Sequence, residues 1–467
     1  MILSNICRVN KSQSMSDILS LLAKYDVATP RYTSYPTVPY WDFSTLDNHK
    51  WKQSVINSFK SENGELCIYI HLPFCESLCT FCACNKRITK NHNVEKLYMD
   101  AVLKEWQLYR NILPGVPVIK EIHLGGGTPT FFSADNLVFL IENIISGSII
   151  KDNHEFSIEI HPNFTTEEHL KKLSAIGFNR MSIGIQDFDP QIQYTINRMQ
   201  SYEQTKYVFD WGRKYNYRSI NVDLIYGLPH QTVKCIEHTI ALIKTLMPDR
   251  IAFYSYAHVP WKSKAQRRYT VNDLPTSSVK WEIYSRGRIL LEQAGFESIG
   301  MDHFALPGDQ LFIAAENGNL HRNFMGYTAT RSKLIIGLGA SAISATKNAF
   351  AQNEKVVEEY EAKVNSGILP LVNGHLLNKE DLIVQNYIHE LMCLNKTTLH
   401  KKLHDPDFLI SVLSKLTSME ADGLVNLGGD AISVTLKGRL FIRNICAAFD
   451  AHLFKKEIAG HTFSKAI

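Results

Sequence analysis

From about residue 65 to residue 256, the sequence alternates between short apolar, β-branched runs and longer stretches with helical spacing. Such a run predicts a buried strand, and apolar residues three and four positions apart predict an amphipathic helix. Six units of this kind in series favour a parallel sheet with helical crossovers, and their spacing suits a partial or complete β/α barrel. The predicted strands are Cys67–Leu72, Glu121–Leu124, Glu155–Ile160, Arg180–Ile185, Ser219–Ile225 and Arg250–Tyr256, and the predicted helices lie near 93–112, 133–146, 166–176, 201–216 and 233–246.

Polar or glycine-rich residues follow each predicted strand. In a β/α barrel the carboxyl ends of the strands meet at one face, where the active site lies. We therefore expect these residues to lie close together. In chain order they are a group of cysteines, Gly125–Pro129, Glu159 and His161, Gln186 and Asp187, Asp223 with Tyr226 and Gly227, and Ala257 with His258.

The segment before the first strand predicts an arm that lies on another part of the protein. Two prolines in Pro30–Thr37 favour extended or turn-rich backbone, and Leu19–Val27 predicts a short helix. The chain then divides into four predicted parts. These are an arm over 1–55, a β/α barrel over 56–300, an irregular extension of the barrel over 301–372 and a C-terminal helical domain over 373–467.

The C-terminal part predicts helices around one hairpin. A helix is predicted near 276–294, after which residues 300–345 give no clear elements. A hairpin is predicted near 424–435, with its turn at Gly428-Gly429-Asp430, and a final helix from Lys437 to about Leu453. Together these elements suggest a small, mostly helical domain that resembles a winged helix.

Composition and charge argue against nucleic acid and membrane partners. The net charge is only +4 over 467 residues, and no dense Lys/Arg block is present. The first residues lack a basic segment followed by an apolar one, and no apolar run is long enough to span a bilayer. We therefore expect a cytoplasmic protein.

Four of the nine cysteines, Cys75, Cys79, Cys82 and Cys84, fall within ten residues. A disulfide framework would instead spread cysteines through a short secreted chain, so this clustering favours a metal site. The spacing C-x3-C-x2-C places three thiolates on one loop, where they can hold three irons of a 4Fe–4S cluster. The fourth iron then has no protein ligand.

An open iron of this kind is what S-adenosylmethionine (SAM) chemistry needs. SAM chelates the iron through its amino and carboxylate groups, and one electron from the cluster breaks the sulfonium bond to give methionine and a 5′-deoxyadenosyl radical. Two alternatives remain open at this point. One is a zinc site, with Cys84 or His92 as the fourth ligand, and the other is a set of unrelated core thiols.

The loop from Cys75 to Cys82 is the radical SAM signature, and further blocks surround it. They are YIHLPFC at 69–75, CACNK at 82–86, PRYTSYPT at 30–37, GGGTPT at 125–130, GFNRMSIGIQDF at 177–188, NVDLIYGLP at 221–229, GMDHFA at 300–305, LHRNF at 320–324 and KGRLFIRNIC at 437–446. With these blocks the chain resembles the oxygen-independent coproporphyrinogen III oxidase family. The resemblance runs from about residue 24 to the C-terminus, so it covers nearly the whole chain.

The resemblance implies one cluster with two SAM molecules beside it. It makes Cys75, Cys79 and Cys82 the iron ligands, and Cys84 and Tyr69 catalytic residues. Cys84 is not expected to bind iron, because a fourth thiolate would block the open site. The first SAM is implied at Tyr69, Gly126, Glu159 and Ile343, and the second at Phe81, Gly127, Thr128, Gln186, Arg198, Asp223 and Ala257.

The residue types agree with these roles. Glycines let the backbone approach a ligand, acidic residues such as Glu159 and Asp223 suit ribose hydroxyls or an amine, and Arg198 suits a carboxylate. Tyr69 shares strand parity with His71, so both are expected to face the barrel interior. Structural alternatives remain open for several of them. The acids and Gln186 would then be polar barrel residues whose hydrogen bonds go to neighbouring residues. Tyr69 and Ile343 would be core residues, Arg198 a helix-surface cation and Cys84 a structural residue.

This chain departs from the family pattern at two places. Many members carry Gly-Asp-Thr-Asp between the positions of Tyr327 and Gly337, where this chain has Arg331-Ser332-Lys333-Leu334. Met325 stands where some members have Gln. We expect both departures near the second SAM and the substrate, and both bear on the details of that pocket.

The family reaction converts coproporphyrinogen III to protoporphyrinogen IX without oxygen, as two propionates lose carbon dioxide and become vinyl groups. The resemblance thus implies a monomeric oxidoreductase of haem biosynthesis that also needs a reductant and an electron acceptor. The four substrate carboxylates require cations, for which Arg31, Arg267, Arg268 and Arg322 are candidates.

Two other functions remain open. One is a haem-binding, radical-SAM-like chaperone without decarboxylase activity, but such relatives lack the Cys84-Asn85-Lys86 continuation and much of the C-terminal domain. The other is a non-catalytic zinc or iron–sulfur module with a winged helix. Metal content distinguishes the last case, because the enzyme needs four irons per chain and the zinc module one zinc.

Overall fold

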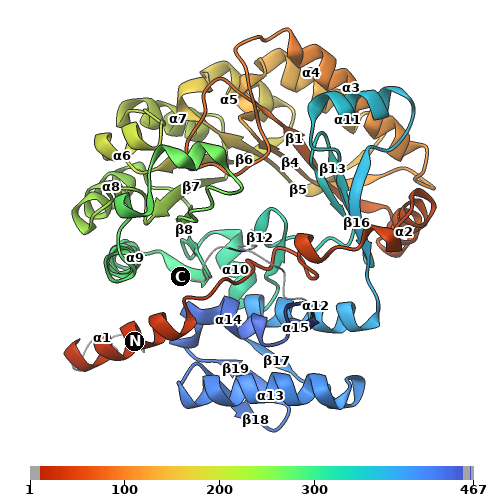
Figure 1. Cartoon of the computed structure of the whole chain (residues 1–467). Coiled ribbons are helices and arrows are strands. Elements are labelled where there is room, and N and C mark those ends of the chain that lie inside the picture. The colour runs from red at the N-terminus through yellow and green to blue at the C-terminus, as the bar shows by residue number, and fades with distance from the viewer. Residues whose placement is uncertain (1–10, 456–462, 464–467) are drawn as a thin grey trace.

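A curved sheet of twelve strands forms the centre of the protein, and helices cover its outer face (Figure 1). The structure is a computed structural model that describes residues 11–455 and residue 463. The strand order is β16-β15-β14-β13-β1-β4-β5-β6-β7-β8-β10-β9, so β16 and β9 form two separate edges. The sheet is therefore an open, partial barrel.

The middle of the sheet consists of parallel strands, as the sequence predicts. Strands β13, β1, β4, β5, β6, β7 and β8 pair in parallel in that order. All six predicted strands are confirmed, with bounds that differ by a few residues. They are β1 (Glu65–Leu72), β4 (Val118–Gly126), β5 (Ile149–Ile160), β6 (Phe178–Gln186), β7 (Ser219–Tyr226) and β8 (Arg250–Ser255).

The crossover helices begin where the sequence supplies capping residues. A Ser or Thr hydroxyl accepts a backbone hydrogen bond at the start of α4, α5, α7, α8 and α9, which satisfies a donor that the first turn leaves free. Helices at all the predicted positions are confirmed. They are α3 (Val94–Arg110), α4 (Ala134–Ile145), α5 (Glu167–Ala175), α7 (Tyr202–Lys214), α8 (Val233–Leu246) and α9 (Ser277–Gln293).

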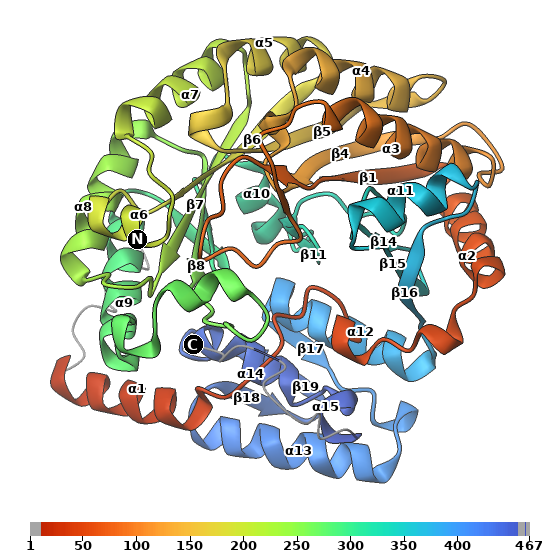
Figure 2. The same ribbon diagram turned by 45° about the horizontal axis from the view of Figure 1, so that its top comes forward.

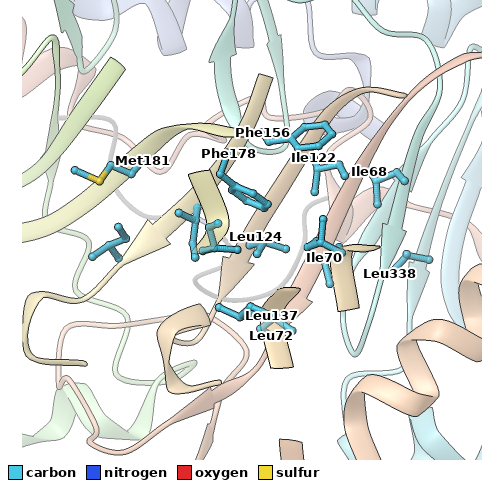
Figure 3. Close-up of a cluster of buried hydrophobic side chains, with 14 of the residues drawn as sticks. Ile68, Ile70, Leu72, Ile122, Leu124, Leu137, Phe156, Phe178, Met181 and Leu338 are labelled. Carbon is cyan, nitrogen blue, oxygen red and sulfur yellow. The ribbon is translucent and has the colours of Figure 1, made fainter. Parts of the chain in front are cut away.

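The main core lies between the sheet and these helices, and Figure 3 shows part of it. Alternate residues of β1, such as Ile68 and Ile70, are fully buried there. Burial of one such side chain stabilises the fold by about 1.5–3 kcal/mol. Tyr69 and His71 point to the other face of the sheet, so the predicted parity is confirmed. Figure 3 labels Ile68, Ile70, Leu72, Ile122, Leu124, Leu137, Phe156, Phe178, Met181 and Leu338.

The segment that the sequence left without clear elements extends the sheet at both edges. One part adds β9 and β10 next to β8, and another adds β13 to β16 next to β1. Between them, a hairpin and α10 lie on the concave side of the sheet (Figure 2). The elements are β9 (Glu297–Gly300), β10 (His303–Ala305), α10 (Gln310–Glu316), β11 (His321–Asn323), β12 (Gly326–Thr328), β13 (Ile335–Leu338), β14 (Ile343–Ala345), β15 (Ala349–Asn353), α11 (Val357–Asn365) and β16 (Leu371–Leu376).

A second core forms the C-terminal domain. The predicted hairpin is confirmed, because β18 and β19 pair in antiparallel fashion, and β17 adds a third strand. The prediction of one helix from Lys437 to about Leu453 is wrong. The Asp450 carboxylate accepts hydrogen bonds from the amides of His452 and Leu453 and so starts a new helix. The elements are α12 (Lys379–Leu394), β17 (Lys396–Thr398), α13 (Pro406–Ala421), β18 (Val425–Gly428), β19 (Ala431–Val434), α14 (Ile442–Ala447) and α15 (Ala451–Lys455).

The N-terminal arm runs between the barrel and the C-terminal domain (Figures 1 and 2). It contains α1 (Lys11–Tyr25), which includes most of the predicted short helix, and leads into α2 (Asn48–Ser61). The Tyr32 hydroxyl donates a 3.0 Å hydrogen bond to Asp450, and the Arg443 guanidinium donates to the Pro30 carbonyl at 3.1 Å. The arm is thus bound to the C-terminal domain, and the four-part division of the chain stays a prediction.

No helix of the described residues is long and apolar enough to cross a membrane.

A buried ion pair joins β8 to α10. Arg250 Nε lies 2.6 Å from Asp309 Oδ1, and their side chains are 5% and 4% exposed. We expect Asp309→Ala to lower the free energy of unfolding by about 3–5 kcal/mol, because it leaves the guanidinium buried without a counter-ion. Glu237→Ala is the matched control, since it breaks a half-exposed pair with Arg286 and should cost about 0–1 kcal/mol. Equal losses in denaturant unfolding would contradict this explanation.

Glu105 on α3 is fully buried and connects α3 to the loop after β13. It accepts hydrogen bonds from the Gly339 amide, the Asn353 amide group and the Tyr360 hydroxyl. Burial raises the pKa of Glu105 from 4.5 to about 7, against the effect of these hydrogen bonds. The folded state therefore binds this proton more tightly than the unfolded state does.

Because the folded pKa is the higher one, this group destabilises the protein progressively as pH rises from about 4.5 to about 7. The total effect is at most about 3 kcal/mol. We expect the unfolding free energy of Glu105→Gln to rise relative to the natural protein between about pH 5 and about pH 8. Parallel pH profiles of the two proteins would contradict the assignment.

Candidate active site

The cysteine loop follows β1 and lies at the carboxyl ends of the parallel strands. Its first part forms the short strand β2 (Phe74–Cys75), which pairs in parallel with β3 (Arg87–Ile88). Cys75 Sγ accepts a 3.3 Å hydrogen bond from Thr128 Oγ1, beyond the end of β4. Cys79 Sγ lies 3.6 Å from Nη1 of Arg198, which follows β6. The thiols thus face residues from two other strand ends, as the sequence predicts.

One side of the loop is fixed by the turn after α6 (Pro190–Thr195). The Thr80 amide donates to the Ile196 carbonyl at 2.9 Å, and the Asn197 side chain donates to the Leu78 carbonyl at 2.8 Å. These bonds bind peptide groups rather than cysteine side chains. The thiols therefore stay available as ligands.

The other side of the loop is fixed by the segment after β8. Gln266 Nε2 lies 2.9 Å from the Phe81 carbonyl and 3.2 Å from the Ala257 carbonyl. Ser263 Oγ donates to the Cys82 carbonyl at 3.1 Å. Gln266 is thus a residue that the sequence interpretation missed, and it joins two of the predicted SAM contacts, Phe81 and Ala257. It lies in a short 3-10 helix over Lys264–Arg268, which is too short to give a sequence pattern, so no sequence signal marked it.

The cysteines suit a cluster better than a single ion. In a 4Fe–4S cluster each thiolate binds a different iron, whereas zinc needs four ligands around one centre. A hydrogen bond with Cys84, and then the charge of Lys86, lower the pKa of the Cys82 thiol to about 6, which favours the thiolate needed for iron binding.

The glycines at the end of β4 and directly after it permit close packing that no other residue allows. A Cβ atom on Gly125 would lie 2.9 Å from Glu159 Oε1, and one on Gly127 would lie 2.6 Å from the Pro73 carbonyl oxygen. Gly126 has a φ of +120°, which disfavours any side chain. The three glycines therefore bring the end of β4 against both the cysteine loop and Glu159.

A hydrogen-bonded chain connects the inner face of β1 to the loop. The Tyr69 hydroxyl lies 3.0 Å from His71 Nδ1, and His71 Nε2 lies 2.9 Å from the Asn85 carbonyl oxygen. Because the carbonyl only accepts, Nε2 carries the proton and the Tyr69 hydroxyl donates to Nδ1. Burial lowers the pKa of His71, which keeps the ring neutral.

Glu159 is an ionised acceptor inside the barrel. Burial opposes its ionisation, but the hydrogen bond from His123 at 3.3 Å and the Gly126 amide at 3.2 Å bring its pKa below the usual value. Its side chain remains 45% exposed, toward the interior cavity. His123, which also stacks on Tyr69 with 5.8 Å between ring centroids, was missed by the sequence interpretation. The sequence could have indicated it, because His123 lies two residues before Gly125 on β4, and alternate residues of a strand point to the same face of the sheet.

Asp223 on β7 lines the same cavity, whose volume is about 150 Å³. Its carboxylate accepts hydrogen bonds from Ser182 at 3.1 Å and from Asn221 at 2.8 Å. Burial, and next the charge of Glu159, raise the pKa of Asp223 to about 6. Met325 also lines this cavity, so the departure at this position does lie beside the predicted site.

Gln186 and Arg198 lie together at the end of β6. Gln186 has a φ of +69° where the register of β6 with β7 shifts. Arg198 Nη2 donates to the Gly184 carbonyl at 2.6 Å, and its Nε is buried without a hydrogen-bond partner among the described residues. Arg198 is therefore not a solvated helix-surface cation, and it retains a donor for a ligand.

Ile343 reaches the site through its backbone. A Cβ atom on Gly337 would lie 2.5 Å from the Ile343 carbonyl oxygen, and Gly337 pairs with Tyr69 in the sheet. Cys84, in contrast, is exposed next to Cys82. The structure thus places all the predicted site residues around one end of the barrel, while their individual roles stay predictions.

Asp187 has a structural explanation instead. It is fully buried and accepts hydrogen bonds from Gln231 at 2.6 Å and Thr239 at 2.8 Å. These bonds join the end of β6 to α8 and the loop before it.

The expectation that Arg331–Leu334 lies near the second SAM is wrong. The Leu334 carbonyl accepts from the Cys67 amide, and the Arg331 carbonyl accepts from Lys120. Cys67 is at the start of β1, so the segment lies at the opposite end of this strand from the cysteine loop. Arg331–Leu334 connects two short strands, β12 and β13, and the sequence of such a connection does not indicate at which end of the sheet it lies.

A cavity of about 640 Å³ lies beyond the end of β8. The arm, α9 and α14 enclose it together with the strand ends. Its lining includes Arg31, Tyr226, Ala257, Trp281 and Arg439. The cavity thus combines aromatic walls with cations, next to a predicted SAM contact.

Comparison with known proteins agrees with this geometry. The model of the radical SAM superfamily matches residues 69–243. The oxygen-independent coproporphyrinogen III oxidase of Synechocystis is 38% identical over 456 residues, which cover 96% of this chain and 97% of the relative. That of Escherichia coli K12 is 37% identical over 94% of this chain and 96% of the relative.

The fold agrees over the same length. The solved structure of the Escherichia coli coproporphyrinogen III oxidase, described as a radical SAM enzyme, has a TM-score of 0.86 at 34% identity. The match covers 93% of this chain and 98% of that one. This chain therefore belongs to the oxygen-independent coproporphyrinogen III oxidase family of radical SAM enzymes.

Proposed function

We propose that this protein converts coproporphyrinogen III to protoporphyrinogen IX by oxidative decarboxylation of two propionate side chains. The observation that carries the proposal is the cysteine loop, which faces Glu159, Arg198 and the glycines of β4 in a chain whose relatives carry this activity over nearly their whole length. Each propionate would lose carbon dioxide, one hydrogen atom and one electron to become a vinyl group.

The residues present suit a 4Fe–4S cluster and SAM, the cofactors of radical SAM enzymes. When bound, the cluster and SAM supply a 5′-deoxyadenosyl radical that removes a hydrogen atom from the substrate. Cys75, Cys79 and Cys82 would hold the cluster, and Cys84 would leave the fourth iron open. The Arg198 Nε, buried without a partner among the described residues, offers a donor to a carboxylate such as that of SAM.

The remaining residues would bind and orient the ligands. Glu159 is ionised and aimed into the cavity, so it can accept from ribose hydroxyls or an amine. The glycine carbonyls of β4 would accept from the SAM ammonium, because residues without a side chain let the backbone approach a ligand closely. Gln266 would keep the Phe81 and Ala257 backbone at a fixed separation, which suits the predicted second SAM.

The 640 Å³ cavity has the size and chemistry for the tetrapyrrole. Aromatic walls suit pyrrole rings, and Arg31 and Arg439 suit propionates. The arm and the C-terminal domain close it on two sides, which would keep water from a reactive intermediate. The reductant, the electron acceptor, the monomeric state, the cytoplasmic location and the lack of nucleic acid and membrane partners stay predictions.

Turnover tests the proposal. We expect the iron–sulfur-reconstituted protein, given SAM, a reductant, an electron acceptor and coproporphyrinogen III without oxygen, to form protoporphyrinogen IX and matching 5′-deoxyadenosine. Cys79→Ala should abolish both products, because it removes one cluster ligand. Cys235→Ala is the control, since Cys235 is on α8, outside the cysteine loop, and its substitution should leave both products unchanged. Cleavage of SAM without vinyl products would keep the radical chemistry and move the substrate elsewhere.

Glu159→Gln tests the SAM contact. The variant loses the charged acceptor, so the Kd for SAM should rise on the order of tenfold to a hundredfold. Iron content should remain unchanged, because Glu159 is not a cluster ligand. Glu168→Gln on the surface of α5 is the matched control, with a side chain 62% exposed. An unaltered SAM affinity, measured by equilibrium dialysis, would assign Glu159 a purely structural role.

A further inference from the structure

Arg322 differs from the other arginines that the sequence nominates as partners of the substrate carboxylates. Arg31 donates to the Ser255 carbonyl at 2.9 Å, and Arg267 donates to the Pro260 carbonyl at 3.2 Å. Arg268 lies over the Tyr194 ring on the exposed surface. Arg322 alone of the four retains buried guanidinium nitrogens, Nε and Nη1, that have no hydrogen-bond partner among the described residues.

The surroundings of Arg322 provide no counter-ion. Arg322 is in β11 opposite Tyr327 of β12, and its guanidinium lies 4.6 Å from the centre of the Tyr327 ring. The ring face attracts the cation but accepts no conventional hydrogen bond. In the described part of the chain, Arg322 takes part in no ion pair. A partly buried cation that has two buried donor nitrogens and no anion beside it is unfavourable, so the site is incomplete without an anionic ligand.

His303 presents a second donor beside Arg322. Its ring meets the Tyr327 ring edge to face at 5.2 Å, and its Nε2 lies 3.5 Å from the Tyr254 hydroxyl. Its Nδ1 is buried without a partner among the described residues. Burial, and next the charge of Arg322, lower the pKa of His303 to about 3, so the ring is neutral. When the Tyr254 hydroxyl donates to Nε2, the ring proton is on Nδ1, the nitrogen that lacks an acceptor.

These donors lie where a ligand of the barrel would reach them. His303, Tyr254 and Tyr327 line the interior cavity together with Glu159 and Asp223. Arg322 lines a second cavity of about 450 Å³, and Asn323 and Thr328 line both. The hairpin β11–β12 thus separates the two spaces, with Arg322 beside the wall that they share.

The charges around the second cavity also favour an anion. Its lining contains four cations of Lys or Arg and a single carboxylate, Glu390. The interior cavity, in contrast, is lined by the carboxylates of Glu121, Glu159 and Asp223, and its two arginines, Arg180 and Arg250, are already paired with Glu155 and Asp309. A carboxylate would therefore be repelled from that part of the barrel and attracted toward Arg322.

We propose that Arg322, together with His303, binds a carboxylate that reaches into the barrel from the 640 Å³ cavity, whose lining includes Asp302, the neighbour of His303 in the chain, and that this carboxylate is a propionate of the tetrapyrrole which does not react. This inference rests on the proposed function. The same chemistry would suit the carboxylate of SAM, so the test separates the two sources. Arg322 is in this view a residue that orients the substrate, since it selects which propionate stays away from the radical.

Binding by the reconstituted holoprotein without oxygen tests the proposal. The probes are coproporphyrin III, which is a stable oxidised form of the substrate with the same four carboxylates, its tetramethyl ester, and SAM. We expect Arg322→Gln to raise the Kd for coproporphyrin III on the order of tenfold or more, as the loss of a charge-assisted contact does. Arg322→Lys should give a smaller increase in this Kd, because lysine keeps the positive charge but lacks the two parallel N–H donors with which arginine binds a carboxylate.

The ester and SAM provide the internal comparisons. Binding of the ester should be the same in Arg322→Gln and in the natural protein, because the ester has no carboxylate to lose. The Kd for SAM should also stay the same. Arg218→Gln is the matched control, since it removes one exposed arginine before β7, and it should leave all three affinities unchanged.

Each other outcome has one meaning. If both Arg322 variants bind coproporphyrin III like the natural protein, the proposal is overturned. If the Kd for SAM rises and that for coproporphyrin III does not, the carboxylate belongs to SAM and the propionate assignment is wrong. If the natural protein itself does not bind coproporphyrin III, the proposed function fails, whatever the Arg322 variants do. Equal melting temperatures of Arg322→Lys and the natural protein exclude misfolding as the cause of a loss.

Discussion

The site depends on hydrogen bonds that fix the cysteine loop through its peptide groups. The loop has almost no regular structure, and its side chains must remain free for iron. Asn197 after β6 and Gln266 after β8 therefore bind the carbonyls of Leu78 and Phe81. Because these residues follow different strands, the loop has its shape only when the sheet is assembled. Folding of the barrel and formation of the cluster site are thus one event.

The inside of the barrel contains several charged groups, and each would be unfavourable there without a partner that stabilises its charge. Glu159 and Asp223 share one cavity, and their mutual repulsion is part of the reason that the pKa of Asp223 is raised to about 6. His123 and the Gly126 amide keep Glu159 ionised in spite of this repulsion. Arg198 and Arg322 retain buried nitrogens without partners among the described residues. The barrel therefore suits ligands that carry both an amine and carboxylates, because the acids of the interior cavity can accept from the amine and the two arginines beyond it can donate to the carboxylates.

The sequence predicts the parallel part of the sheet because each strand shows a continuous buried face. In β1, for example, Leu66, Ile68 and Ile70 alternate with inward residues, and such a pattern needs no knowledge of distant contacts. The strands from β9 to β16 could not be predicted from the sequence. Most of them have only three to five residues, which is too short to show an alternation of buried and exposed residues. The prediction also fails at Asp450, where one capping side chain divides an otherwise continuous helical pattern.

The predicted site residues fall into the same two classes. Those in the carboxyl-terminal half of a strong strand, such as Glu159 and Asp223, could be placed from the pattern, because parallel strands end at a common face. The roles of Gln266 and Arg322 could not, since they arise from contacts between segments far apart in the chain. The position of Arg331–Leu334 was predicted wrongly for this reason too, because the direction of the neighbouring short strand was unknown.

The central claim is that three thiolates hold a 4Fe–4S cluster whose fourth iron is open to SAM. The most direct measurement is the electron paramagnetic resonance spectrum of the reduced, reconstituted protein with and without SAM. The account predicts the signal of a reduced 4Fe–4S cluster, and a change in that signal when SAM binds the open iron. A cluster signal that SAM leaves unchanged, or one zinc per chain in place of iron, would contradict the account.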